Sequence, residues 1–321
     1  MIEKILATVF FPGAIFILAV SLFYEWVDRK LYARFQNRVG PHLAGPFGLF
    51  QPIADLIKLL SKEDIVPMAT DRFLFTLTPI LAPALILFAC MFLPVAGPSG
   101  IISFEGDLIA VIALLSIYTI TVYLAGEGSN NRFASVGAVR AAVQLLGYEI
   151  PLTLSLLSVA LAAGSLSIRG IVEAQAERGL WFIAGIQAIG FAIFIIASQA
   201  EMERIPFDIP EAEQEIVAGW EVEYSGRRLA LFRLSKDLEL FLLSGLGAAV
   251  FLGGPMGPVM PGLEPMLYTI YFILKSIIVL AIFTLVRALF ARLRIDQMVS
   301  FSWRYLMPPA MILIILTEVI M

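Results

Sequence analysis

The sequence has few of the residues with which proteins bind metals or form disulfides. Its 321 residues include one cysteine, Cys90, and one histidine, His42. An intrachain disulfide, a four-ligand zinc site and an iron–sulfur cluster held by cysteines are therefore excluded. There is no GxxxxGKS/T phosphate loop and no convincing dinucleotide fingerprint. We expect no catalytic centre, metal site or cofactor on this chain, so that any electron chemistry belongs to a partner or a bound organic molecule.

Charge is scarce as well. Charged residues make up 15% of the chain and the net charge is −4, which argues against a nucleic-acid binder. Hydrophobic residues make up 60%, whereas a soluble domain carries roughly 45–50%. We predict an all-α integral membrane protein that forms a single polytopic domain over residues 1–321. Eight segments are suited to cross a bilayer: residues 5–26, 73–95, 108–125, 147–164, 180–200, 229–253, 266–289 and 301–320.

The basic residues lie mostly in alternate loops. Sixteen of the 22 lie in or directly beside the loops that follow the first, third, fifth and seventh segments, with Arg287 and Arg304 flanking the last loop. By the positive-inside rule these loops, at about residues 27–72, 126–146, 201–228 and 290–300, face the cytoplasm. Both termini are then expected outside the plasma membrane. Arg287 and Arg292 are typical of charges that flank a span at its cytoplasmic end.

The first of these loops contains an amphipathic stretch. Apolar residues from Leu49 to Leu60 follow helical spacing, and Gln51, Asp55 and Lys58 fall on the opposite face. This pattern predicts a helix that lies in the membrane interface. Two roles are open for it, simple membrane anchoring and the docking of a partner.

The most informative segment is residues 200–226, which we call the acidic loop. Eight carboxylates within it share one base, Arg204; they are Glu201, Glu203, Asp208, Glu211, Glu213, Glu215, Glu221 and Glu223. Two carboxylates about 6 Å apart repel by about 3 kcal/mol at an effective dielectric constant near 20. If the loop folds back into the protein, some of these groups share protons and can act as a proton relay.

Apolar residues alternate with the acids and favour burial of this loop. They are Ile205, Phe207, Ile209, Ile216, Val217, Trp220, Val222 and Tyr224. The alternative is a solvated acidic loop in which Pro210 opens a short helix.

Further ionisable residues fall inside predicted spans. Glu149 opens the fourth span, Lys236, Asp237 and Glu239 lie in the sixth, and Lys275 lies in the seventh. Charged groups inside a bilayer are costly and mark an ion path or a buried pair. We add these five residues to the candidate relay. Mutual neutralisation of Lys236, Asp237 and Glu239 is the structural alternative.

Four segments in order carry a family signature: residues 28–64, 128–151, 203–226 (ERIPFDIPEAEQEIVAGWEVEYSG) and 292–308. Together with the eight spans they resemble the family of NADH dehydrogenase subunit 1 and the NADH–quinone oxidoreductase H subunit, which is the heel subunit of respiratory complex I. The resemblance implies a subunit that couples a soluble redox module to ion movement. It implies that Glu149, Glu213 and the neighbouring loop carboxylates lead protons towards antiporter-like subunits. It also implies that ten residues form the interface with the soluble module: Arg29, Arg34, Gln36, Arg38, Gln51, Asp55, Arg204, Phe207, Arg294 and Asp296.

One stretch departs from that family. Complex I members usually continue with a phrase like LFFLAEY, whereas this chain reads LFRLSKD. Arg233 thus replaces an aromatic residue, and Lys236 and Asp237 replace Glu and Tyr. This looks more like the corresponding subunit of archaeal energy-converting membrane-bound NiFe hydrogenases. The scarcity of asparagine, at three residues, hints at a thermophile.

The expected function is therefore that of a heel subunit that anchors a ferredoxin-oxidising, hydrogen-evolving module and couples it to proton or sodium translocation. The NiFe centre and the iron–sulfur clusters would lie on soluble hydrogenase-like large and small subunits over the cytoplasmic loops. Antiporter-like and small membrane subunits would lie alongside. The alternatives are the quinone-binding subunit of complex I, of NADH or F420H2 type, and the equivalent subunit of a ferredoxin-dependent polysulfide-reducing complex. A stand-alone transporter is disfavoured because the sequence shows no internal repeat.

Overall fold

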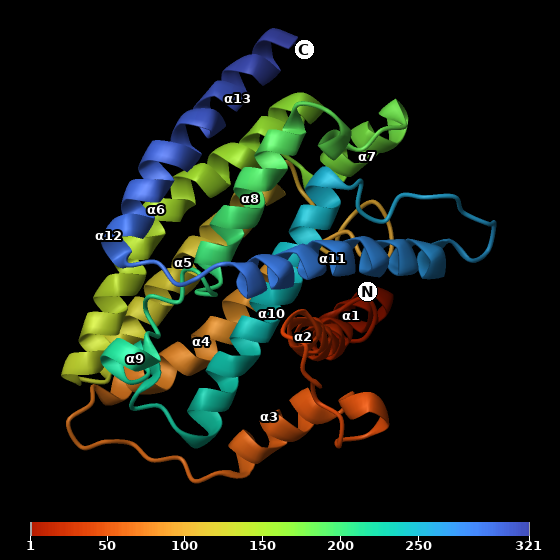
Figure 1. Cartoon of the computed structure of the whole chain (residues 1–321). Coiled ribbons are helices and arrows are strands. Elements are labelled where there is room, and N and C mark those ends of the chain that lie inside the picture. Colours follow the sequence, from red (N-terminus) through yellow and green to blue (C-terminus); the bar gives the residue numbers. More distant parts are fainter. Residues whose placement is uncertain (1, 321) are drawn as a thin grey trace.

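The structure, a computed structural model, describes residues 2–320, apart from the side chains of residues 2–5 and Glu213. Every regular element in these residues is a helix (Figure 1), so the predicted all-α membrane fold is confirmed. The α-helices are α1 (Ile2–Val9), α2 (Ala14–Phe35), α3 (Gln51–Ser61), α4 (Arg72–Cys90), α5 (Asp107–Gly128), α6 (Arg132–Ala163), α7 (Ile168–Arg178), α8 (Gln187–Glu201), α9 (Glu213–Ile216), α10 (Gly226–Phe251), α11 (Glu264–Leu289), α12 (Ile295–Phe301) and α13 (Met307–Ile320).

Six helical segments are long and apolar enough to cross a membrane, and they correspond to six of the eight predicted spans. They are Leu6–Phe35, Arg72–Cys90, Asp107–Gly128, Arg132–Ala163, Glu264–Leu289 and Ile295–Ile320. The fifth predicted span is the apolar helix α8, which has only 15 residues. The sixth is α10, whose 26 residues are long enough to cross but carry several charges in the first half.

Two boundaries differ from the predictions. The first span is interrupted between α1 and α2, and α2 continues to Phe35, well beyond the predicted end at residue 26. The loop expected at residues 126–146 is mostly helix, because α5 ends at Gly128 and α6 begins at Arg132. Asn131 caps α6 by accepting a hydrogen bond from the Phe133 amide at 2.8 Å. The capping residue thus starts a 32-residue helix where the composition indicates a loop.

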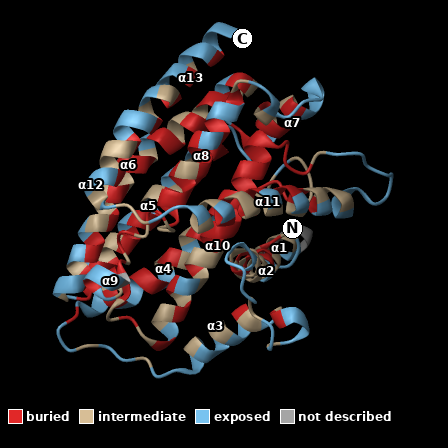
Figure 2. Ribbon diagram, in the orientation of Figure 1, coloured by how far each residue is buried: buried red, intermediate tan, exposed pale blue. Residues whose placement is uncertain are grey.

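Helix α10 is the centre of the molecule. It packs against α2, α3, α4, α7, α8 and α11. From Leu238 to Phe251 every residue of α10 is buried, and Figure 2 shows this part of the helix in red where α11 does not cover it. A helix enclosed on all sides has no polar face to turn to solvent. The charges of α10 therefore lie in its first half, where the acidic loop covers it, with the exception of Glu239, which is buried just beyond the middle of the helix.

The acidic loop folds back against α6. The Gln144 side-chain amide on α6 donates to the backbone oxygens of Ala200 at 2.7 Å and Phe207 at 2.9 Å. Gly137 allows the close approach of the loop, because a Cβ atom there would lie 2.6 Å from the Trp220 nitrogen. The predicted burial is confirmed for Phe207, Ile209, Ile216, Trp220 and Tyr224, whereas Val217 is exposed.

Candidate functional site

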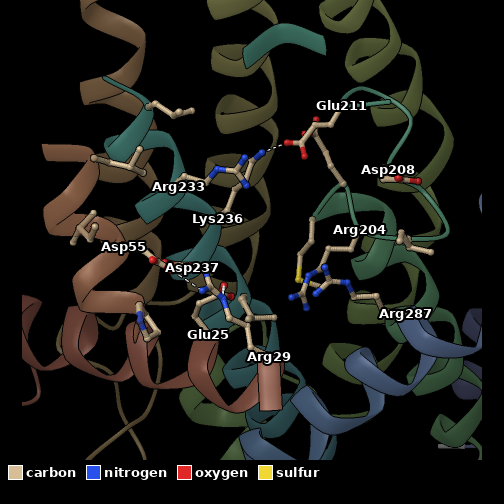
Figure 3. Close-up of a pocket in the computed structure, with 18 of the residues that line it drawn as sticks. Glu25, Arg29, Asp55, Arg204, Asp208, Glu211, Arg233, Lys236, Asp237 and Arg287 are labelled. Atoms are coloured by element: carbon tan, nitrogen blue, oxygen red, sulfur yellow. Dashed lines mark hydrogen bonds and ion pairs between the residues drawn. The ribbon is translucent and has the colours of Figure 1, made fainter. Parts of the chain in front are cut away.

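A cavity of about 740 Å³ lies where α2, α3, the acidic loop, α10 and α11 meet (Figure 3). Twelve of its lining residues are charged: Glu25, Arg29, Asp55, Glu203, Arg204, Asp208, Glu211, Arg233, Lys236, Asp237, Arg287 and Arg292. Six of these are acids and six are bases, so the wall is electrically balanced when all are ionised. The apolar part of the wall comes largely from α3 and α10, through Pro52, Leu56, Leu59, Leu229 and Leu240. The cavity can therefore hold a polar group beside an apolar one.

At one end of the cavity, ion pairs join α2 to α3. Arg29 on α2 pairs with Glu25 at 2.5 Å and with Asp55 on α3 at 2.6 Å. The Gln51 side chain donates to Asp55 at 2.8 Å. Asp55 of the predicted amphipathic helix thus faces the cavity together with the apolar Leu56 and Leu59. The apolar residues Ile53, Ile57 and Leu60 of the same helix are exposed.

A buried carboxylate fixes the acidic loop to two spans. Asp28 on α2 has a side chain that is 1% exposed and pairs with Arg204 of the loop and with Arg287 on α11, the latter at 2.9 Å. The Thr284 hydroxyl donates to the same carboxylate at 2.6 Å. Because a buried charge needs partners, these contacts explain how Arg204 and Arg287 are tolerated at the cavity wall.

At the other end of the cavity, Lys236 on α10 lies between two carboxylates. Its ammonium group pairs with Glu211 and with Glu221, and it lies 4.9 Å from the centre of the Trp220 ring. Arg233, one turn earlier, pairs with Glu221 at 3.2 Å. Figure 3 shows Arg233 and Lys236 facing Glu211 across the cavity wall.

Burial changes the acidity of two loop carboxyls next to this lysine. Burial raises the pKa of Glu203, while Lys236 and a hydrogen bond from the Trp220 indole oppose the shift. Burial also raises the pKa of Glu221 to about 7, with Arg233 opposing and the charge of Glu203 adding to the shift. A carboxyl that titrates near neutral pH can both take up and release a proton.

A row of carboxyls continues from the loop into the helix bundle. Glu201 lies close enough to Glu149 and Glu203 for their charges to interact, and its side chain hydrogen-bonds to Tyr148. Glu239 on α10 interacts in the same way with Glu201 and Glu203. In the described residues, one buried oxygen of Glu201 and one of Glu239 have no hydrogen-bond partner. These orphaned oxygens are suited to accept a proton or a water molecule.

Other acids of the candidate relay lie apart from this row. Glu215 is half exposed and pairs with Arg140 at 2.5 Å, and this hydrogen bond lowers the pKa of Glu215. Glu223 accepts a hydrogen bond from Asn131 at 2.5 Å. Asp208 pairs with Arg292 at the cavity wall, and Asp237 lines the same wall. The Glu213 side chain lies outside what the structure describes. Among the described side chains, no group of three His, Cys, Asp or Glu could hold a metal ion.

Lys275 lies far from the cavity. Its ammonium group donates to the Met256 carbonyl at 2.8 Å and lies 5.1 Å from the centre of the Trp181 ring. Both partners belong to the connections beyond the far ends of α10 and α7. Lys275 therefore stands outside the row of carboxyls that the relay requires.

The whole chain is similar to membrane subunits of known oxidoreductases. The family model for NADH dehydrogenase matches residues 7–318. The chain belongs to the NADH dehydrogenase family. It is 42% identical to the NADH–quinone oxidoreductase H subunit of Brevibacillus brevis over 97% of this chain and 93% of that protein. It is 40% identical to the H subunit of Dehalococcoides mccartyi strain 195, over 94% of this chain and 83% of that protein. It is also 40% identical to the second H subunit of Geobacter sulfurreducens, over 94% of this chain and 92% of that protein.

These relatives correct part of the sequence-based interpretation. The resemblance to the H-subunit family is confirmed. The narrower expectation of a hydrogenase complex from an archaeal thermophile is not supported, because the relatives are bacterial and are named for NADH–quinone oxidoreductases. The departure at Arg233 and Lys236 therefore occurs within a chain that otherwise matches that family over nearly its full length.

The ten residues expected at the interface with the soluble redox module divide into two groups. The five residues of the surface group are exposed: Arg34, Gln36, Arg38, Arg294 and Asp296. The other five lie at or behind the cavity wall. Arg29, Asp55 and Arg204 line the cavity, Gln51 holds Asp55, and Phe207 is buried.

Sequence reasoning missed several charged residues at or behind the cavity wall. The sequence pattern indicates that Arg287 and Arg292 are ordinary charges at the cytoplasmic end of a span, but both line the cavity wall. Glu25 lies there too, and Asp28 anchors the wall from behind. The available signal was the position of Glu25 and Asp28 at the end of an otherwise apolar span, where an acid needs a partner.

Proposed function

We propose that this chain is the membrane subunit of a quinone-reducing, complex I-like oxidoreductase that moves protons. Its cavity receives the quinone head group, and the loop carboxyls carry protons from the cavity into the helix bundle. The observation that carries this proposal is the continuity of the charged cavity with the buried row: Glu203 lines the cavity and interacts with Glu201, and both interact with Glu239.

The cavity wall suits an amphipathic quinone. The head group carries two carbonyl oxygens, for which the cationic donors Arg29 and Arg204 are available at the wall. The prenyl tail needs an apolar surface, which Leu56, Leu59 and Leu240 provide. Reduction to the quinol takes up two electrons and two protons. A soluble partner docked over the surface group supplies the electrons, and acids at the wall supply the protons.

The removal of protons from this wall changes its charge balance, and the change drives the relay. Each proton lost leaves an additional carboxylate near Glu203 and Glu221. A neighbouring carboxylate about 6 Å away repels it by about 3 kcal/mol. Proton uptake from the row through Glu201, Glu239 and Glu149 relieves this repulsion. In this arrangement the loops at the cavity face the cytoplasm, the termini lie outside, and residues 1–321 act as one membrane domain beside antiporter-like subunits.

The test is photolabelling of the purified complex with an azido-quinone, followed by peptide mapping. The proposal expects labelled peptides from α2, α3 and α10, and loss of labelling when unmodified quinone is added in excess. Asp55→Leu should weaken the labelling, because it breaks the pair with Arg29, while Glu173→Gln on α7 should leave it unchanged. Labelling that maps away from the cavity, or that quinone does not displace, would contradict the proposal.

A second candidate is a subunit of a ferredoxin-oxidising NiFe hydrogenase complex. The presence of the cations of Arg233 and Lys236 in the cavity favours it, because the sequence departs there from the quinone-reducing pattern. The metal content of the soluble subunits that co-purify separates the two functions. Stoichiometric nickel supports the hydrogenase, and its absence together with quinone reduction supports the first proposal.

A further inference from the structure

Lys236 is the shared cationic partner of two carboxylates that come from separate parts of the acidic loop. Glu211 lies before α9, and Glu221 lies at the end of the short helix Gly219–Glu221. The ammonium group contacts both of them at once. The Lys236 side chain is 17% exposed, so bulk water screens these pairs only weakly.

The two carboxylates differ in what else they contact. Glu221 has a second cation, Arg233, at 3.2 Å. Among the described residues, Glu211 forms its ion pair with Lys236 alone. A neutral Glu211 would leave Lys236 on Glu221, and a neutral Glu221 would leave it on Glu211. The position of Lys236 therefore depends on which of the two carries a proton.

We propose that Lys236 is a positioning residue that lets only one of Glu211 and Glu221 carry a proton at a time. The ammonium group of Lys236 is only 17% exposed and needs at least one ionised partner, so the state in which both acids are protonated is disfavoured. A proton that arrives from the cavity at Glu211 moves Lys236 to Glu221, and transfer of a proton to Glu221 moves it back. Lys236 thus links the protonation of Glu211 at the cavity wall to the position of the acidic loop. The link to proton transfer rests on the proposed function, whereas the link between Lys236 and the loop does not.

The first test measures amide hydrogen exchange of residues 211–224 in the purified complex. Lys236→Met should speed exchange on both sides of α9 by about tenfold, equivalent to about 1.4 kcal/mol. Glu211→Gln, which mimics the protonated acid, should speed exchange only near residue 211, because Lys236 stays with Glu221. Glu221→Gln should do the reverse. Equal effects of the two Gln variants across the whole loop, or no effect of Lys236→Met, would overturn the proposal.

The second test is the number of protons moved per quinone reduced in proteoliposomes. Lys236→Met should lower this ratio at least about twofold, and Lys236→Arg, which keeps the charge, should restore it. Arg227→Met removes an exposed base of the same helix and should leave the ratio unchanged. An unaltered ratio in Lys236→Met refutes the role of Lys236. Failure of the unmodified complex to reduce quinone refutes the proposed function instead, and the exchange experiment then still tests the lysine.

Discussion

Replacement of Asp28 by Asn should destabilise the protein more than any exposed change of the same kind. The carboxylate lies on α2 and joins Arg204, in the acidic loop, to Arg287 on α11. Thr284 donates a further hydrogen bond to it at 2.6 Å. An amide keeps the shape of the side chain but removes its negative charge, so the two guanidinium groups lose the carboxylate that they share.

The magnitude follows from the burial of the group. Breaking a buried ion pair by removal of one partner costs about 3–5 kcal/mol, and Asp28 is 1% exposed. The same carboxylate-to-amide change in the exposed pair Arg169–Glu173, as Glu173→Gln, should cost at most about 1 kcal/mol. The double variant with Arg287→Gln should be less destabilised than the sum of the two single changes, because the second change removes one of the uncompensated charges.

The assay is thermal unfolding of the complex in detergent, combined with limited proteolysis of the acidic loop. Asp28→Asn should lower the unfolding midpoint clearly below that of Glu173→Gln and should expose the loop to protease. Equal midpoints for these two variants would refute the reasoning, because they would mean that the guanidinium groups are not held in a buried site.

Three further predictions concern other parts of the molecule. Burial raises the pKa of Glu221 to about 7, against about 4.3 in an unfolded chain. The folded protein therefore binds this proton more tightly, and the resulting stabilisation is complete below about pH 4 and is lost as the pH rises through about 7. Glu221→Gln should thus flatten the fall of the unfolding midpoint between these pH values. Gly137→Val places a side chain against the Trp220 backbone and should loosen the acidic loop, seen as faster proteolysis, while the bundle stays helical by circular dichroism. Lys275→Met should lower stability but leave the proton-to-quinone ratio unchanged, because Lys275 contacts Met256 and Trp181 rather than the carboxyl row. A lower ratio would instead show that Lys275 takes part in proton transfer.

The helices could be predicted largely because long apolar runs have few other stable arrangements. The errors occur where composition and structure diverge. Residues 132–146 contain Arg and Gln and were expected in a loop, but the Asn131 cap and the packing against the acidic loop make them the first turns of α6. Helix α7 was missed because its sequence, IRGIVEAQAER, is too polar and too short to read as a span.

The acidic loop of the site could be predicted from the sequence, whereas the ion pairs that hold it could not. The density of acids between Glu201 and Glu223 identified the loop, and the alternating apolar residues indicated its burial. The pairing of Asp28 with Arg204 and Arg287 joins residues 176 and 259 positions apart. Such pairs depend on how helices pack, and a single sequence holds no signal for them. Lys236 was identified as unusual, but its two partners became apparent only in three dimensions.

In the proposed function, buried carboxyls connect the cavity to the interior of the helix bundle. The most direct measurement is the number of protons moved per quinone reduced by complexes that carry Glu239→Gln, with Glu264→Gln at the exposed start of α11 as the control. The account predicts that Glu239→Gln continues to reduce quinone but moves fewer protons, while the control behaves like the unmodified complex. A full proton-to-quinone ratio in Glu239→Gln would contradict it.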